Sequence, residues 1–295
     1  MIRFDGRVVL ITGSGGGLGR AYAKFLSARG ARVIINDRDE ITANATAAHL
    51  VSAGGDAVAI VADVGEASQC RALVEQAVEH FGRLDAVVNN AGLGAHTGSL
   101  DKLTDERLDR IVRTHLLGTI EVSRAAWPHL VASGSGRLVM IASGAFLGTP
   151  GNPIYAAVKG GVIGFMRVLA IDGAESGVTA NAVMPIGYSA GAARNPNETV
   201  RAWMERAFPA SLAAPPVAWF CHGSCTITGE VVTAGGGRVA RMAVTTTPGL
   251  QMGHDLTIEA LADRWTEVLD VDRARAVSNS RADMALFEGD AAWRS

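Results

Sequence analysis

Short apolar runs alternate along this chain with longer stretches of helical periodicity. The runs have strand length and are bounded by turn-forming residues; they lie at 7–12, 31–35, 57–62, 84–88, 137–141, 178–184 and 230–233. The stretches between them predict helices at about 18–29, 40–53, 66–81, 104–132, 153–174 and 214–222. Strands that alternate with helices predict an α/β fold: a doubly wound, Rossmann-like parallel sheet with helices on both faces.

The alternating pattern ends near Gly237, which predicts one domain over 1–237 and a C-terminal extension over 238–295. The extension has one predicted helix, 257–269, whose apolar residues recur on one face; they are Ile258, Leu261, Trp265 and Leu269. Such a stripe needs burial, so we expect the extension to pack on the domain or on a partner subunit, in a homodimer or homotetramer. Residues 186–216, interrupted by prolines, predict an irregular substrate loop or lid.

Composition excludes several classes of function. Among the 295 residues, 48% are hydrophobic and 35 are glycine, and the net charge is −2. This balance gives no electrostatic field for nucleic acid or an acidic membrane. No run approaches the 18 apolar residues of a membrane helix, and a strand begins almost at the N-terminus, so we expect no signal peptide and a cytoplasmic protein.

The cysteines fit a reducing compartment. They number three, Cys70, Cys221 and Cys225. The segment Cys221-His222-Gly-Ser-Cys225 offers too few ligands for a zinc site and has no second cluster. We therefore expect buried thiols and no metal.

A glycine-rich turn joins the first strand to the first helix. It reads Thr12-Gly-Ser-Gly-Gly-Gly-Leu-Gly19 and spaces its glycines as Gly13-x-x-x-Gly17-x-Gly19. Glycines let the backbone approach a phosphate, and the helix start directs amides at it. We expect a dinucleotide phosphate to contact this turn, through Gly13, Gly16, Gly17, Leu18 and Gly19. The alternative is a plain strand-to-helix turn.

Asp37 ends the second strand, where an acidic residue can bind the adenosine ribose hydroxyls. A carboxylate there favours NAD and repels the extra phosphate of NADP, although the adjacent Arg38 can accept that phosphate. Alternatively, Asp37 only caps the turn before the next helix.

Further candidates follow the other strands, because ligands of a doubly wound sheet bind beyond the carboxyl ends of its strands. The expected cofactor contacts are Asp63, Val64, Asn90, Ala91, Gly92 and Pro185. Asn89 either contacts the ligand or braces neighbouring strands through hydrogen bonds to the backbone.

Ser143, Tyr155 and Lys159 form a candidate catalytic group. Ser143 follows the strand 137–141, and Tyr155 and Lys159 are four residues apart on the next helix, so they share a helical face. A tyrosine holds its proton to about pH 10, and a nearby ammonium lowers that pKa. The pair suits acid–base chemistry near neutral pH. The alternative is a chance YxxxK match with a tyrosine that only packs.

These motifs, in this order, resemble the short-chain dehydrogenase/reductase superfamily over residues 5–237. The resemblance implies that Tyr155 is the catalytic acid/base and that Lys159 binds the nicotinamide ribose and lowers the pKa of Tyr155. It implies that Ser143 hydrogen-bonds the reacting oxygen.

Two departures from the superfamily pattern point to a subgroup: His115 replaces the usual asparagine, and Pro185-Ile-Gly187 replaces Pro-Gly. With Arg124-Ala-Ala-Trp127, they resemble the dehydrogenase unit of peroxisomal multifunctional enzymes type 2. That resemblance implies NAD-dependent oxidation of a (3R)-hydroxyacyl-CoA. His115 either shuttles a proton or packs as a structural histidine.

Three readings of function stay open: a hydroxyacyl-CoA dehydrogenase, a hydroxysteroid dehydrogenase, and a non-catalytic dinucleotide-binding regulatory protein. The predicted lid supplies cations that suit CoA phosphates; they are Arg194, Arg201 and Arg206. Alternatively, Arg201 pairs with Glu205 on a solvated helix face. The lid also supplies apolar groups that suit a steroid, namely Trp203, Met204, Phe208 and Leu212.

Overall fold

The computed structural model describes residues 1–94, 98–188, 193 and 196–288. It divides into two compact units, Met1–Arg241 and Met242–Ser295. This boundary lies four residues beyond the 237/238 boundary expected from the sequence, because Arg238–Met242 continues the sheet of the first unit as strand β8. What the extension packs against stays a prediction.

The first unit is built on one eight-stranded sheet with the order β3-β2-β1-β4-β5-β6-β7-β8. Its strands are β1 (Val8–Ile11), β2 (Arg32–Asp37), β3 (Asp56–Val61), β4 (Ala86–Asn89), β5 (Arg137–Ile141), β6 (Thr179–Pro185), β7 (Val231–Gly235) and β8. Strands β1 to β7 pair in parallel. Gly236 and Gly237, both at positive φ, make the two-residue turn into β8, which is typical of a hairpin. The predicted fold class is confirmed.

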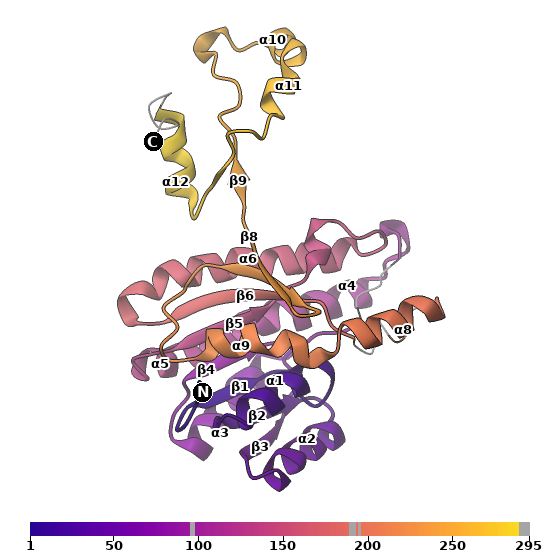
Figure 1. Ribbon diagram of the computed structural model, residues 1–295, viewed down its shortest axis with the longest axis vertical. Coiled ribbons are helices and arrows are strands. Elements are labelled where there is room, and N and C mark those ends of the chain that lie inside the picture. Colours follow the sequence, from indigo (N-terminus) through magenta and orange to yellow (C-terminus); the bar gives the residue numbers. More distant parts are fainter. Residues whose placement is uncertain (95–97, 189–192, 194–195, 289–295) are drawn as a thin grey trace. The chain divides into compact units, whose positions relative to one another are not determined.

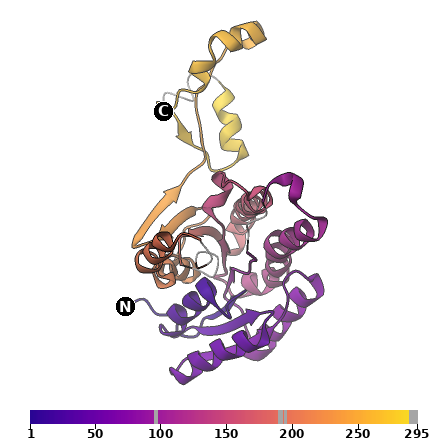
Figure 2. The same ribbon diagram turned by 90° about the vertical axis from the view of Figure 1, so that its right-hand side faces the viewer.

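Helices cover both faces of this sheet (Figures 1 and 2). On one face, α1 (Gly17–Ser27), α2 (Glu40–Ser52) and α9 (Ala214–Cys221) share an apolar core with the strands. On the other, α3 (Ala67–Phe81), α5 (Gly118–Ala132) and α6 (Pro153–Asp172) pack on the sheet, and α3 also packs on α5. The order of the strands reverses between β1 and β4, which places the ligand crevice of such folds at their carboxyl ends.

The helical stretch predicted at 104–132 is interrupted by a π-helical turn. It begins as α4 (Asp105–Val112), where the Thr104 hydroxyl accepts a hydrogen bond from the Arg107 amide (3.3 Å). The π turn spans Arg113–Leu117, and α5 continues from it. Such turns are rare and concentrate at functional sites; here the turn carries His115.

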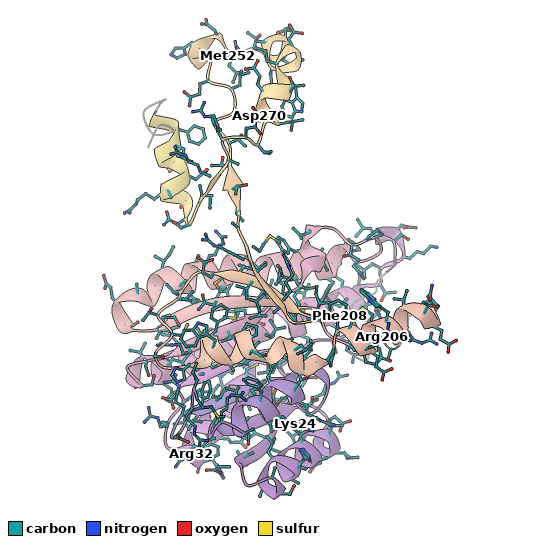
Figure 3. All side chains as sticks on the ribbon, viewed as in Figure 1. Lys24, Arg32, Arg206, Phe208, Met252 and Asp270 are labelled. Carbon is teal, nitrogen blue, oxygen red and sulfur yellow. The ribbon has the colours of Figure 1, made fainter. Side chains whose placement is uncertain are left out.

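The prediction of an irregular segment over 186–216 was wrong for Glu198–Ala207, which forms helix α8. The side chain of Asn197 caps this helix by accepting from the Val200 amide (3.2 Å). Trp203 is 48% exposed and packs edge-to-face on Phe208 at 5.0 Å between ring centroids. Figure 3 labels Arg206 and Phe208 at the end of this helix.

Helix α6 has 20 residues and a mean hydropathy of 1.6, enough by length and composition to cross a membrane. The expectation that no segment reaches that threshold was therefore wrong. The same composition is found in core helices of globular proteins, and α6 packs against β5 and β6. That packing buries 33% of the apolar window, whereas Val168 and Ile171 stay exposed.

In the extension, the helix predicted at 257–269 breaks at Arg264 into α10 (Ile258–Asp263) and α11 (Trp265–Val268). The remaining elements are the strand pair β9 (Thr245–Thr246) and β10 (Arg275–Ala276), and helix α12 (Ser280–Ala285). The exposed fractions of Ile258, Trp265 and Leu269 are 77%, 49% and 61%. The extension by itself therefore does not cover these three side chains of the stripe.

Candidate active site

A cavity of about 370 Å³ lies at the carboxyl ends of the central strands. The catalytic and cofactor-binding residues expected from the sequence line it, with the exception of Gly17; they are Gly13, Gly16, Leu18, Gly19, Asp37, Asp63, Val64, Asn90, Ala91, Gly92, His115, Ser143, Tyr155, Lys159 and Pro185. Residues as far apart in the sequence as Gly13 and Pro185 therefore meet in one space, as the topology of the sheet predicts.

The glycine turn is held close to the loop after β4. A Cβ on Gly13 would lie 2.7 Å from the Ala91 Cα, and Gly13 has a φ of 62°. The Asn90 Nδ2 donates to the carbonyls of Thr12 and Gly13, both at 2.9 Å. Gly16 is the N-cap of α1 and brings no side-chain cap. The first amides of α1 therefore remain as donors for an anion.

Asp37 is fixed through both carboxylate oxygens. Oδ2 accepts from the Gly15 amide (3.1 Å) and Oδ1 from the Asp39 amide (3.2 Å). The turn-capping alternative is therefore observed, and it does not remove Asp37 from the cavity wall. The half-exposed Arg38 directs Nη1 toward Asp63 Oδ2 at 4.0 Å.

Lys159 is buried close to the Tyr155 ring. Its Nζ donates to the Ile141 carbonyl (2.6 Å) and lies 5.7 Å from the centroid of the Tyr155 ring. Burial disfavours the ammonium and lowers its pKa to about 8.

The pKa of Tyr155 is raised from its ordinary value by burial, against a lowering by the Ser143 hydrogen bond. The expectation of a lowered pKa was therefore wrong for the unliganded protein. The physical reason is that burial outweighs the lowering by the Ser143 hydrogen bond.

His115 stands at 2% exposure beside Tyr155, with 5.1 Å between the ring centroids. Its Nε2 accepts from the Leu93 amide (3.0 Å), so the neutral ring carries its proton on Nδ1. Among the described residues Nδ1 has no hydrogen-bond partner. Burial, reinforced by Lys159, lowers the pKa of His115 to about 3. A proton shuttle through this ring would require Nε2 to give up the Leu93 amide; the structural alternative keeps it.

Asn89 braces neighbouring elements. Its Nδ2 donates to Ser123 Oγ at 3.0 Å, and it approaches the Met140 sulfur at 3.4 Å. Asn89 therefore braces β4 against α5 and β5, but the expectation that it does so through backbone groups was wrong, because both partners are side chains.

Sequence reasoning missed the backbone partners at the site, the Leu93 amide and the Ile141 carbonyl. Backbone groups are the same in every residue, so no pattern of side chains could have found them. Among the described residues, no group of three or more His, Cys, Asp or Glu side chains is arranged to hold a metal. Burial raises the pKa of the Cys221 thiol to about 12.

Of the lid arginines, Arg194 lies outside the described residues. Arg201 donates to the Pro196 carbonyl (3.1 Å), and Arg206 is exposed. Neither is part of the cavity lining in the described chain.

Comparison with known proteins agrees with this geometry. The short chain dehydrogenase family matches residues 7–201. Peroxisomal multifunctional enzyme type 2 of Mus musculus is 37% identical over 287 residues, covering 92% of this chain and 38% of the mouse protein. A protein of Mycobacterium tuberculosis named a short-chain type dehydrogenase/reductase is 34% identical, covering 91% of this chain and 96% of its own length. The chain thus spans well under half of the mouse relative.

Solved structures show the same fold. Full-length peroxisomal multifunctional enzyme type 2 from Drosophila melanogaster superposes with a TM-score of 0.82 at 28% identity, covering 97% of this chain and 50% of that one. A 3-ketoacyl-(acyl-carrier-protein) reductase from Brucella melitensis, complexed with NADH, has a TM-score of 0.73 at 31% identity and covers 79% of this chain and 98% of its own. A gluconate 5-dehydrogenase from Burkholderia cenocepacia, in complex with NADP, has the same TM-score at 29% identity, covering 80% and 96%.

Members of this family bind NAD or NADP and act on a CH–OH group. The matched family, the parallel sheet and the meeting of Ser143, Tyr155 and Lys159 in one cavity lead to the same conclusion. The chain belongs to the short-chain dehydrogenase family.

Proposed function

We propose that this protein is an NAD-dependent oxidoreductase that interconverts a (3R)-hydroxyacyl-CoA and the 3-ketoacyl-CoA. The observation that carries the proposal is the meeting of Ser143, Tyr155 and Lys159 in one cavity that Asp37 also lines. The relation to multifunctional enzymes type 2 supports the acyl-CoA class.

In the proposed oxidation, the Ser143 hydroxyl orients the substrate hydroxyl, and the Tyr155 oxygen takes its proton. Bound NAD⁺ supplies the hydride acceptor for the hydrogen on the same carbon. Lys159 keeps a positive charge below Tyr155, which favours the phenolate that this transfer needs. Burial raises the Tyr155 pKa, so the ammonium and the bound cofactor have to offset it.

The preference for NAD over NADP rests on Asp37. Because both of its oxygens are already held by backbone amides, the carboxylate is oriented before the ribose arrives. It offers acceptors to two hydroxyls and repels a 2′-phosphate. Losing the hydrogen bonds between Asp37 and the ribose hydroxyls should cost about 1–3 kcal/mol of binding free energy. Titration with NADH and NADPH tests this, and equal or tighter NADPH binding would shift the assignment to Arg38.

The hydroxysteroid reading is favoured by the apolar side chains of α8, where Trp203 is half exposed beside Phe208. The deciding experiment compares kcat/KM for (3R)- and (3S)-hydroxyacyl-CoA thioesters and a 17β-hydroxysteroid. A tenfold preference for the steroid, or equal use of both thioester enantiomers, would refute the thioester assignment. NADH binding without turnover of any alcohol would instead favour the regulatory reading.

We further propose a homodimer or homotetramer. The outward side of α6 carries Val168 and Ile171, which are 54% and 56% exposed, and the extension exposes its own apolar stripe. Apolar patches of this kind mark interfaces between subunits. Light scattering at working concentration checks the proposal, and a monomer would contradict it.

A further inference from the structure

We propose that Arg20 and Thr46 are positioning residues for the dinucleotide: together they fix the Gly15 carbonyl and thereby aim the glycine turn and Asp37 at the ligand. The inference rests on the proposed function only in so far as the cavity binds NAD(H). Neither residue belongs to the cavity lining, and both act through Gly15.

The Gly15 carbonyl receives an unusual number of donors. Arg20 donates to it through Nε (3.1 Å) and through Nη2. The Thr46 hydroxyl donates to it at 3.0 Å and accepts from Arg20 Nε at 2.8 Å. Thr46 is 1% exposed. One carbonyl oxygen thus joins the glycine turn to α1, which carries Arg20, and to α2, which carries Thr46.

Because the peptide bond is planar, holding the Gly15 carbonyl also fixes the direction of the N–H that follows it. In a trans peptide the carbonyl and the following N–H point to opposite sides, and the chain has no cis peptide bonds among its described residues. With the Gly15 oxygen turned toward Arg20 and Thr46, the Gly16 N–H points away from them. Gly16 lines the cavity and Gly15 does not. The clamp therefore holds the Gly16 amide on the ligand side.

The other side of Gly15 fixes the ribose-binding carboxylate. Its amide donates to Asp37 Oδ2 at 3.1 Å. The fit is tight, because a Cβ on Gly15 would lie 2.6 Å from Thr42 Oγ1 and 2.9 Å from Asp37 Oδ2. If Gly15 shifts, the phosphate-binding amides and Asp37 lose their orientation together.

Arg20 lies in the first turn of α1, where a cation opposes the helix dipole. A positive charge at this place also attracts a diphosphate directly, so charge and geometry have to be separated. Arg20→Met removes both, and Arg20→Lys keeps the charge but loses the planar fork. Thr46→Val removes a hydroxyl without a change of charge or shape, and Thr46→Ser restores the hydroxyl. Arg29→Met is the matched control, since Arg29 stacks on Phe25 at the other end of α1.

The experiment measures the Kd of NADH and of NADPH by fluorescence, with the melting temperature of each variant. We expect Arg20→Met to raise the Kd of NADH by about tenfold or more, and Thr46→Val by about threefold to tenfold. Arg20→Lys should be intermediate, and Thr46→Ser and Arg29→Met should stay near the wild type. The preference for NADH over NADPH should shrink in Arg20→Met. In turnover, the KM for NAD should rise more than kcat falls.

An unchanged Kd in folded Thr46→Val would overturn the proposal, as would full recovery in Arg20→Lys, which would assign the effect to charge alone. If Arg20→Met does not fold, the Thr46→Val and Thr46→Ser pair still decides. These binding measurements need no alcohol, so a failure of the acyl-CoA assignment leaves them intact.

Discussion

The two ends of the parallel strands differ in how their polar groups are paired. We call the side with the amino ends the amino edge of the sheet, and the side with the carboxyl ends the carboxyl edge. At the amino ends of the strands, Arg137 is 4% exposed and donates to four carbonyls; they are those of Gly136, Gly177, His222 and Gly223. At the carboxyl ends, Lys159 is as deeply buried, but within the described part of the chain it donates only to the Ile141 carbonyl. The His115 ring lies 5.1 Å from the Tyr155 ring, centroid to centroid, and its Nδ1 has no partner among the described residues.

Arg7 and Asp85 complete the network at the amino edge. Arg7 donates to Ser135 Oγ and to the Ser135 carbonyl, both at 2.9 Å. Asp85, fully buried, accepts from Arg83 and from the Val8 amide (2.8 Å). At this edge most side-chain donors and acceptors are paired inside the protein, although Arg7 Nε and Thr179 Oγ1 have no partner among the described residues. At the carboxyl edge, by contrast, the polar groups line the cavity. Substitutions should therefore separate stability from activity by edge.

The largest effect is expected at the carboxyl edge. Tyr155→Phe should lower kcat by about 1,000-fold or more, because it removes the proton-transfer group, and should leave NADH binding and the free energy of unfolding near the wild-type values. Steady-state kinetics with NADH titration checks this. Retention of more than a tenth of the activity would contradict the mechanism.

The opposite pattern is expected at the amino edge. Arg137→Met should lower the free energy of unfolding by about 3 kcal/mol, since several buried carbonyls lose their donor, with kcat/KM little changed. Denaturant unfolding measures it. The control is Arg32→Met, at a residue labelled in Figure 3. It removes an exposed ion pair with Asp56 and a distant contact with the Phe81 ring (6.0 Å), and should cost less than about 1 kcal/mol. Equal losses in the two variants would remove the distinction between the edges.

Lys159→Met should abolish turnover and yet stabilise the fold near neutral pH. Because the folded-state pKa is about 8, below the ordinary 10.5, the unfolded chain binds more protons between these values. Wild-type stability therefore rises with pH across that window. The advantage of the variant, at most on the order of 3 kcal/mol, should be full below pH 8 and vanish above pH 10.5. Unfolding across pH measures it, with exposed Lys24→Met (Figure 3) as control.

The effect that is smallest at neutral pH concerns His115, because its ring is mostly neutral there in both the folded and the unfolded chain. Its folded-state pKa is about 3 and its ordinary value 6.5, so the wild type should lose stability as pH falls from 6.5 toward 3. The asparagine of His115→Asn can still accept a hydrogen bond from the Leu93 amide. The free energy of unfolding of this variant should fall less between pH 6.5 and pH 3 than that of the wild type. Unfolding midpoints at several pH values check this. If the variant lost as much stability as the wild type over this pH range, His115 would not be the buried base that causes the loss.

The carboxyl edge was predictable because its chemistry is carried by side chains with distinctive spacing, from Gly13 to Lys159. The amino edge was not, because Arg137 finds carbonyls that have no signature in sequence. For the same reason the sequence did not predict the role of Arg20, whose partner is the Gly15 carbonyl oxygen. It did not predict the π turn at Arg113–Leu117 either. Helix α8 was missed although Asn197 marks its start, since nearby prolines were given more weight. The pKa of Tyr155 depends on burial, which spacing does not report.

The contact between Gly92 and His115 restricts the routes by which this sequence can change. A Cβ at position 92 would lie 2.6 Å from His115 Cε1, so the two positions cannot be varied independently. A bulkier residue at 92 is admissible only after the imidazole has been replaced by something smaller. In directed evolution the order of the two substitutions then decides whether the intermediate folds. Libraries that vary position 92 alone would miss every sequence that combines a larger residue at 92 with a smaller one at 115.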